Sequence, residues 1–243
     1  MTRLGFIYPG GGAEPDYYRF AEAHGFQAFL VGSRIPGGDD HNVAALLQTA
    51  RTEYIIEAAQ RLLTLRVDAV LWACTSGSFI VGRAGAEAQV RALRAVTGKP
   101  ATSTSLAFID ALTALEARRV AVLATYPEPA ARAFAEFLGA FGVTVGSLSV
   151  LGAANGFDAA RIGAERLKLI LDSADLEGID AVLVPDTALP SLDVVESVEA
   201  SAGRPVLTAN QVTLWAALGL VRHDVATVDF GRIFSVAYKE GLQ

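Results

Sequence analysis

The chain of 243 residues contains a single cysteine and only three histidines. One cysteine excludes an intrachain disulfide and a zinc site built on cysteine ligands. The histidines, His24, His41 and His223, lie far apart in polar, loop-like stretches, which argues against a histidine metal site. We therefore expect no metal ion, and the lone Cys74 needs another explanation.

Basic residues and long apolar runs are also scarce. Lysine and arginine number 20 against 26 acidic residues, the net charge is −6, and no basic cluster occurs, so we expect no nucleic-acid partner and no binding to an anionic membrane surface. The most apolar stretch, residues 69–82, is shorter than the roughly 20 residues of a membrane-spanning helix. The apolar run at residues 4–8 is too short for a secretory signal. We expect a cytoplasmic protein.

The hydrophobic content is high enough for a large core, at 52%, with 19% charged residues. Short apolar runs predict strands at residues 4–8, 28–31, 69–73, 101–104, 120–125, 144–150, 181–185 and 206–208. Longer amphipathic runs predict helices at residues 17–24, 43–65, 79–97, 106–115, 130–141, 159–174, 192–201 and 211–218. This alternation predicts an α/β fold with parallel sheets, and nearly continuous apolar strands indicate that helices cover both sheet faces.

Three short motifs occur twice, in the same order. An apolar strand that starts at arginine is followed by Tyr-Pro, a second strand starts with Asp-Ala-Val-Leu, and a third follows Gly-Lys-Pro or Gly-Arg-Pro; the copies begin at Arg3, Asp68 and Gly98 and again at Arg119, Asp180 and Gly203. Each match alone fits chance similarity between apolar strands, but three in order indicate an internal repeat.

The repeat predicts two similar doubly wound halves, related by pseudo-twofold symmetry, that face each other across a cleft. We expect an N-terminal half at residues 1–115, against which residues 210–243 pack back, and a C-terminal half at residues 116–209. Ligands of open parallel sheets bind where the strands end. The repeat would place Cys74 and Asp186 at equivalent positions on the two walls.

Cys74 ends an apolar run and precedes Thr75, Ser76 and a long helical pattern. A thiol at the start of a helix lies near backbone N–H groups that favour the thiolate, and the two hydroxyls could help to hold a carboxylate. The alternative is a buried core cysteine followed by an ordinary Ser/Thr cap.

Asp186 and Tyr126 also follow apolar strands. A carboxyl at the mouth of an apolar strand has a pKa raised toward a range useful for proton transfer, although Asp186 could equally cap a helix. The Tyr126 phenol could donate to a substrate carboxylate or lie in water. The first loop, with Pro9, Gly10 and Gly11, fits neither a Walker loop nor a dinucleotide fingerprint, so it allows close approach of a small ligand or forms a tight turn.

Several segments resemble the aspartate/glutamate racemase superfamily, closest to its maleate cis-trans isomerase and arylmalonate decarboxylase branch. They are Cys74-Thr-Ser-Gly-Ser-Phe79, Ala124-Thr-Tyr126, Leu151-Gly152, Pro185-Asp-Thr-Ala-Leu189 and Ala209-Asn-Gln-Val-Thr-Leu-Trp215, and the likeness runs from Arg3 to about Phe234. The resemblance implies two α/β halves with the active site between them. It also implies catalysis without cofactor or metal, and it admits a homodimer.

By resemblance, Cys74 corresponds to the first of two active-site cysteines, which is the nucleophile in maleate isomerases. Asp186 stands where the second cysteine is expected, and Gly10, Gly11 and Gly12 replace an asparagine-containing segment of the isomerases. The implied substrate-binding residues are Pro9, Gly10, Gly11, Thr75, Ser76, Tyr126, Asn155, Thr187 and Ala188.

The leading hypothesis is therefore a cofactor-independent isomerase of a small carboxylate or dicarboxylate. Cys74 would act as nucleophile or base and Asp186 as the opposed acid and base. The alternatives are an arylmalonate decarboxylase-like lyase whose proton comes from Asp186, an amino-acid or hydroxy-acid racemase, and a carboxylate-binding protein without catalysis.

Overall fold

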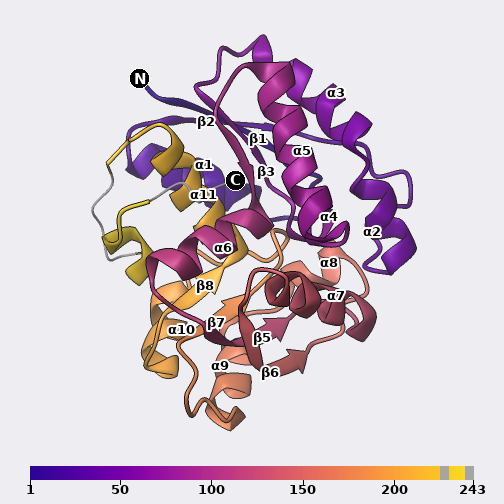
Figure 1. Ribbon diagram of the computed structural model, residues 1–243. Coiled ribbons are helices and arrows are strands. Elements are labelled where there is room, and N and C mark those ends of the chain that lie inside the picture. Colours follow the sequence, from indigo (N-terminus) through magenta and orange to yellow (C-terminus); the bar gives the residue numbers. More distant parts are fainter. Residues whose placement is uncertain (225–229, 239–243) are drawn as a thin grey trace.

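The computed structural model describes residues 1–224 and 230–238, and its strands form two parallel four-stranded sheets (Figure 1). The first sheet has the order β2 (Gln27–Val31), β1 (Arg3–Ile7), β3 (Ala69–Trp72), β4 (Ala101–Ser103). The second repeats this order with β6 (Thr144–Val150), β5 (Arg119–Ala124), β7 (Ala181–Val184), β8 (Val206–Thr208). The predicted strands agree with these within one residue at each end, which confirms the α/β class and the two similar halves.

The repeated motifs have the same structural role in both halves. The Arg3 N–H donates to Asp68 Oδ2 at 2.8 Å, and the Arg119 N–H donates to Asp180 Oδ2, also at 2.8 Å. In return the N–H of each aspartate donates to the carbonyl of its arginine at 2.7 Å. Each aspartate thus fixes the start of one central strand to the start of the next, which explains why the motif occurs once per half.

Helices surround both sheets. They are α1 (Glu14–Ala23), α2 (Val43–Thr49), α3 (Thr52–Leu63), α4 (Thr75–Phe79), α5 (Gly82–Thr97), α6 (Thr104–Ala114), α7 (Glu128–Gly139), α8 (Gly156–Ala160), α9 (Ala164–Ser173), α10 (Val195–Ala202), α11 (Ala209–Leu220) and the short 3₁₀ helix η1 (Arg232–Ser235). Three predicted helices are each divided in two, because Arg51 and Gly163 are extended and Gly82 has a φ of +68°. These residues interrupt the backbone ladder although the apolar pattern continues past them.

Helices α6 and α11 lie between the two sheets and contact each other (Figure 1). Most of their side chains are buried, as expected for helices that are apolar on all sides. The hydroxyls of Thr104 and Thr213 join them at 2.7 Å. Helix α11 also contacts β3, β4 and β8, so it links both halves, and the boundary at residues 115 and 116 stays a prediction. The predicted packing of residues 210–243 against the N-terminal half includes residues 225–229 and 239–243, which lie outside the described part of the chain.

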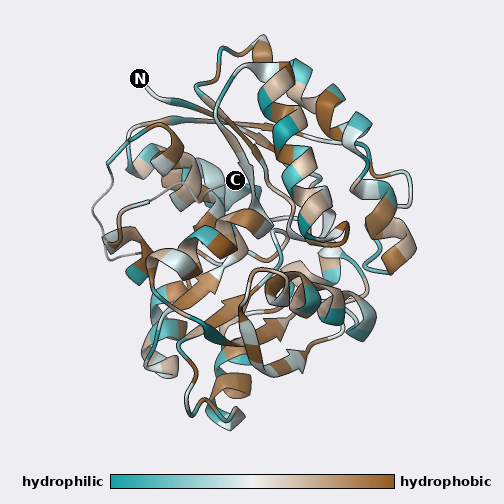
Figure 2. Cartoon of the chain, viewed as in Figure 1, coloured by the Kyte–Doolittle hydropathy of each residue, from teal (hydrophilic) through white to brown (hydrophobic). Residues whose placement is uncertain are grey.

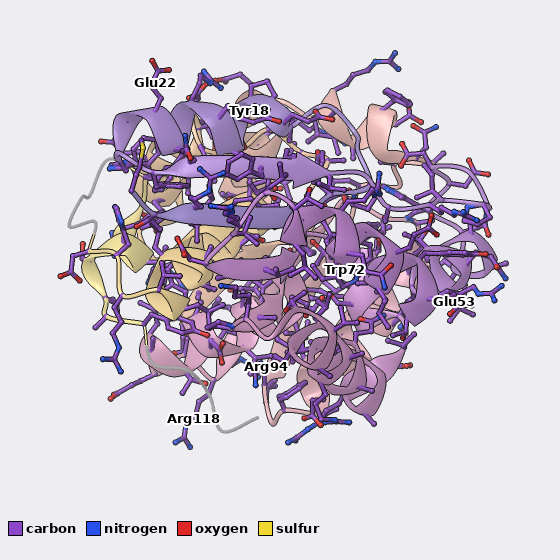
Figure 3. All side chains as sticks on the ribbon, turned by 90° about the horizontal axis from the view of Figure 1, so that it is seen from above. Tyr18, Glu22, Glu53, Trp72, Arg94 and Arg118 are labelled. Carbon is purple, nitrogen blue, oxygen red and sulfur yellow. The ribbon has the colours of Figure 1, made fainter. Side chains whose placement is uncertain are left out.

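Hydropathy follows this layering. The strands are largely hydrophobic and the outer helices carry a hydrophilic face (Figure 2). Glu22, Glu53 and Arg118 extend from the surface, whereas Trp72 lies inside the molecule (Figure 3). Within the described residues, no helix is long and apolar enough to cross a membrane.

Candidate active site

Strands of both sheets end at one small pocket. Cys74 lies two residues beyond β3, and Asp186 lies two residues beyond β7. The pocket has a volume of about 30 Å³ and is lined by Pro9, Gly10, Ile35, Gly38, Asp39, Asp40, His41, Leu46, Thr49, Cys74, Ser76, Asp186, Thr187 and Ala188. Such a cavity holds one or two water molecules, so a small carboxylate requires it to widen.

Cys74 immediately precedes α4, and the residue is 5% exposed. The Gly77 N–H donates to Sγ at 3.2 Å, and the Ser76 hydroxyl lies 3.7 Å from Sγ. Burial raises the pKa of the thiol to about 12, and the charge of Asp186 contributes in the same direction. Cys74 therefore carries its proton at neutral pH unless a nearby group accepts it.

Asp186 is buried and accepts two hydrogen bonds. The Thr125 hydroxyl donates to Oδ2 at 2.7 Å, and the Ala188 N–H donates to Oδ1 at 2.9 Å. Burial raises the pKa of the carboxyl above its ordinary value, while His41 and these two donors act in the opposite direction. The carboxyl is thus held in place and has a raised pKa, as proton transfer near neutral pH requires.

His41 was not predicted from sequence, yet it lies against Asp186. Its Nε2 is 3.9 Å from Asp186 Oδ2, and its ring packs edge-on against Tyr126 at a centroid distance of 4.9 Å. The backbone N–H of His41 donates to the Ala154 carbonyl at 2.8 Å, and Nδ1 lies 3.1 Å from the Ala153 carbonyl. Its polar loop context gave no sign of this burial, because its partners come from the other half of the chain.

Tyr126 and Thr75 form the buried floor beside the pocket. Each is 1% exposed. Burial and the nearby Asp186 raise the pKa of Tyr126, while Thr75 and Ser76 act in the opposite direction. The Thr75 hydroxyl is fully enclosed and lies beside the Tyr126 phenol.

The glycine loop after β1 packs directly on the Asp186 wall. The Tyr8 hydroxyl donates to the Thr187 carbonyl and accepts from the Ala13 N–H, each at 3.2 Å. Gly11 has a φ of +133°, and a Cβ there would lie 2.7 Å from the Cβ of Ala188. The glycine is therefore required both by its backbone conformation and by the closeness of the two loops.

The predicted binding residues differ in their relation to the pocket. Five of them line it, namely Pro9, Gly10, Ser76, Thr187 and Ala188, and three contact residues of its lining, namely Gly11, Thr75 and Tyr126. Asn155 is not part of the lining. Its side-chain oxygen accepts the Asp158 N–H at 2.9 Å and so caps α8. Their roles in binding stay predictions.

A second pocket lies away from Cys74 and Asp186. A larger pocket of about 650 Å³ lies between the end of α11 and residues 234–238, and neither Cys74 nor Asp186 lines it. It borders residues outside the described part of the chain. Among residues 1–224 and 230–238, no group of three or more His, Cys, Asp or Glu side chains could hold a metal ion.

Comparison with known proteins places this arrangement in a family. The arylmalonate decarboxylase family matches residues 48–234. The chain belongs to the arylmalonate decarboxylase family. Arylmalonate decarboxylase of Bordetella bronchiseptica is 29% identical to this family member over 207 residues, which cover 84% of this chain and 82% of the relative.

Maleate isomerases are equally similar to this member of the arylmalonate decarboxylase family. Maleate isomerase of Nocardia farcinica is 30% identical over 173 residues, or 68% of each chain. A solved mutant of Nocardia farcinica maleate cis-trans isomerase, with a covalently bound succinylcysteine intermediate, shares the fold with a TM-score of 0.87 and 23% identity, covering 96% of this chain and 98% of that one. These relatives confirm the resemblance seen in the sequence.

Proposed function

We propose that this chain catalyses the cofactor-independent cis–trans isomerisation of a small carboxylate or dicarboxylate. Cys74 would be the nucleophile, and Asp186 the general acid and base. The observation that carries the proposal is that the only cysteine of the chain and a buried carboxyl line one pocket, each two residues beyond an equivalent strand of the two halves.

The proposed reaction balances without any cofactor. The Cys74 thiol passes its proton to the ionised Asp186 carboxylate, and the thiolate adds to one carbon of the double bond. Asp186 gives a proton to the neighbouring carbon, which leaves a single bond that can rotate. After rotation Asp186 takes a proton back from that carbon, the C–S bond breaks, and the double bond re-forms in the other geometry. Asp186 finally returns its proton to the Cys74 sulfur, so the thiol and the carboxylate are restored.

The hydroxyl groups beside Cys74 suit a substrate carboxylate. The Thr75 hydroxyl lies buried beside the Tyr126 phenol, and Ser76 lines the pocket. These hydroxyls and the Tyr126 phenol can donate to the enediolate that forms as the thiolate adds, which is the charge that preorganised donors stabilise best. On the opposite wall, Thr187 and Ala188 would face the second end of the substrate.

The relatives support this chemistry. Curated relatives named maleate isomerase match over 68% of this chain, and the Nocardia isomerase mutant holds a succinylcysteine adduct. Such an adduct is the species expected from addition of Cys74 to maleate followed by protonation.

Incubation with maleate and related unsaturated acids, followed by intact-protein mass spectrometry and NMR in heavy water, tests the proposal. We expect turnover, a trapped adduct on Cys74, and loss of turnover in Cys74→Ser. Full activity in Cys74→Ser together with an unmodified Cys74 in the native protein would refute the assignment.

Decarboxylation is the second candidate, because the arylmalonate decarboxylase family itself matches the chain. Here loss of CO₂ leaves an enediolate, and Asp186 supplies the proton to its carbon while Cys74 is not required. CO₂ release from disubstituted malonates that survives Cys74→Ser and is abolished by Asp186→Asn would favour this reaction. Turnover of unsaturated acids that is lost in Cys74→Ser as well as in Asp186→Asn favours isomerisation.

A further inference from the structure

The pairing of His41 with Asp186 joins two loops that are far apart in the sequence. We propose that His41 and Asp186 share one proton between Nε2 and Oδ2, so that His41 acts through Asp186 as a positioning residue for the proton exchanged with substrate. The catalytic part of this inference rests on the proposed function, whereas the shared proton can be tested without turnover.

The orientation of the imidazole is fixed by its surroundings. A carbonyl oxygen can only accept, so the 3.1 Å contact between Nδ1 and the Ala153 oxygen places a hydrogen on Nδ1. Nε2 therefore carries the lone pair in the neutral ring, and it is the nitrogen that lies 3.9 Å from Asp186 Oδ2. The packing of the ring against Tyr126 holds this orientation.

The remaining gap is about one ångström longer than a hydrogen bond. Contacts of this kind often shorten when substrate binds. The Asp186 carboxyl is held for the exchange by the Ala188 N–H on Oδ1 and the Thr125 hydroxyl on Oδ2, and Oδ2 is the oxygen nearest to His41. A proton on Oδ2 can then pass to the substrate carbon, and a proton from that carbon can return to the pair.

The pair is surrounded by groups that affect its titration. Those close enough to interact with Asp186 or His41 are Tyr8, Asp39, Cys74, Thr125 and Tyr126, which come from the ends of three strands and from the loop of His41 itself. Arginine and lysine are missing from the described pocket lining. His41 is consequently the basic side chain of the lining.

This arrangement predicts a particular pH profile. The pKa of the Cys74 thiol is raised to about 12, so as pH rises the pair loses its proton before the thiol does. The reactive form has a thiolate and a protonated pair. It carries the same number of protons as the predominant form at intermediate pH, which has a thiol and a deprotonated pair, so the ratio of the two forms does not change with pH. The value of kcat/KM should therefore rise with pH through the titration of the pair and then stay level until the thiol titrates.

Replacing His41 by glutamine changes both parts of this profile together. In the native pair the proton can reside on Asp186 Oδ2 or on His41 Nε2, whereas in His41→Gln it can reside only on Asp186. The variant therefore binds this proton less tightly and loses it at lower pH. We expect the rising, acid part of the kcat/KM profile to move to lower pH. The plateau value of kcat/KM should fall about tenfold for each pH unit of that movement, because both quantities depend on the affinity of the pair for its proton. Because both proteins are assayed with the same substrate, ionisation of the substrate affects both pH profiles equally and does not contribute to their difference.

A control and a second measurement make the outcome decisive. His223→Gln removes a histidine whose nitrogens contact Thr2 and the His24 carbonyl, and we expect it to leave the acid limb in place. A lower plateau in His41→Gln without movement of the limb would show a purely structural role and overturn the inference.

NMR of histidine-labelled protein tests the shared proton even without substrate, because the chain has only three histidines to assign. We expect a hydrogen-bonded Nε2 proton signal of His41 that is lost in Asp186→Asn, with the signals of His24 and His223 unchanged. A His41 ring whose signals are the same in both proteins overturns the pairing. If the His41 signal is lost as expected but no acid is turned over by the native protein, the pairing stands and the proposed function fails.

Discussion

The hydrogen bond between Thr125 and Asp186 gives the sharpest prediction for stability. Thr125 is fully buried, and its hydroxyl donates to Oδ2 at 2.7 Å. Thr125→Val keeps the shape of the side chain and removes only this donor. A hydrogen bond to a charged group contributes about 1.5–3 kcal/mol and one between neutral groups about 0.5–1.5 kcal/mol, so the cost depends on whether Asp186 is ionised.

The sign of the pH dependence follows from the raised pKa of Asp186. A carboxyl whose pKa is higher in the folded than in the unfolded protein makes folding less favourable as pH rises from the unfolded value through the folded one. Loss of the Thr125 donor raises that pKa further. We expect Thr125→Val to lower the free energy of unfolding by about 2 kcal/mol at high pH, where Asp186 is ionised, and by about 1 kcal/mol at low pH, where it is neutral.

Thermal unfolding at the two pH values measures this difference. For a chain of this size about 1 kcal/mol corresponds to roughly 2–4 °C, so the midpoint should fall by about 4–8 °C at the high pH and by half as much at the low pH. Thr125→Ser, which retains a hydroxyl, is the matched control and should keep the native pH dependence. Equal losses for the valine variant at both pH values would refute the reasoning.

Three further changes have defined outcomes. Gly77→Ala would place a Cβ 2.6 Å from the Trp72 ring and 3.0 Å from Cys74 Sγ, so we expect a loss of about 1–3 kcal/mol in chemical denaturation. Alkylation of Cys74 by iodoacetamide should be slow at neutral pH and accelerate toward the pKa of about 12, and Asp186→Asn should speed it by removing a charge that raises this pKa. The pKa of Asp180 is lowered by the N–H groups it accepts, so Asp180→Asn should reduce stability at neutral pH, with the difference vanishing in strong acid as that carboxyl is protonated.

Each of these has a matched comparison. Gly139→Ala lies in α7 where a Cβ meets nothing within 4 Å, and should not destabilise the protein. An equal loss in both glycine variants would contradict the clash at Gly77. Alkylation at the same rate in Asp186→Asn as in the native protein would show that Asp186 does not affect the thiol. A stability difference for Asp180→Asn that persists unchanged into strong acid would contradict the role of its charge.

The extent of the fold that could be predicted from sequence reflects burial. Strands such as β3 and β7 are covered on both faces, so their apolar runs are continuous and their limits are visible in the chain. The helix breaks at Arg51 and Gly163 escaped prediction because hydrophobic periodicity does not record single residues that leave the helical conformation.

The sequence by itself determined the architecture, the duplication, and the position of Cys74 and Asp186 at equivalent strand ends. Local patterns suffice for these because each depends on residues that are neighbours in the chain or on a motif that repeats. Only the tertiary structure decided that His41 lies against Asp186 and that the Asn155 side chain caps α8 while its backbone pairs with Asp40 of the pocket lining. The His41 ring and the Ala153 carbonyl are 112 positions apart, and no local pattern specifies a contact formed when two halves of a chain pack together.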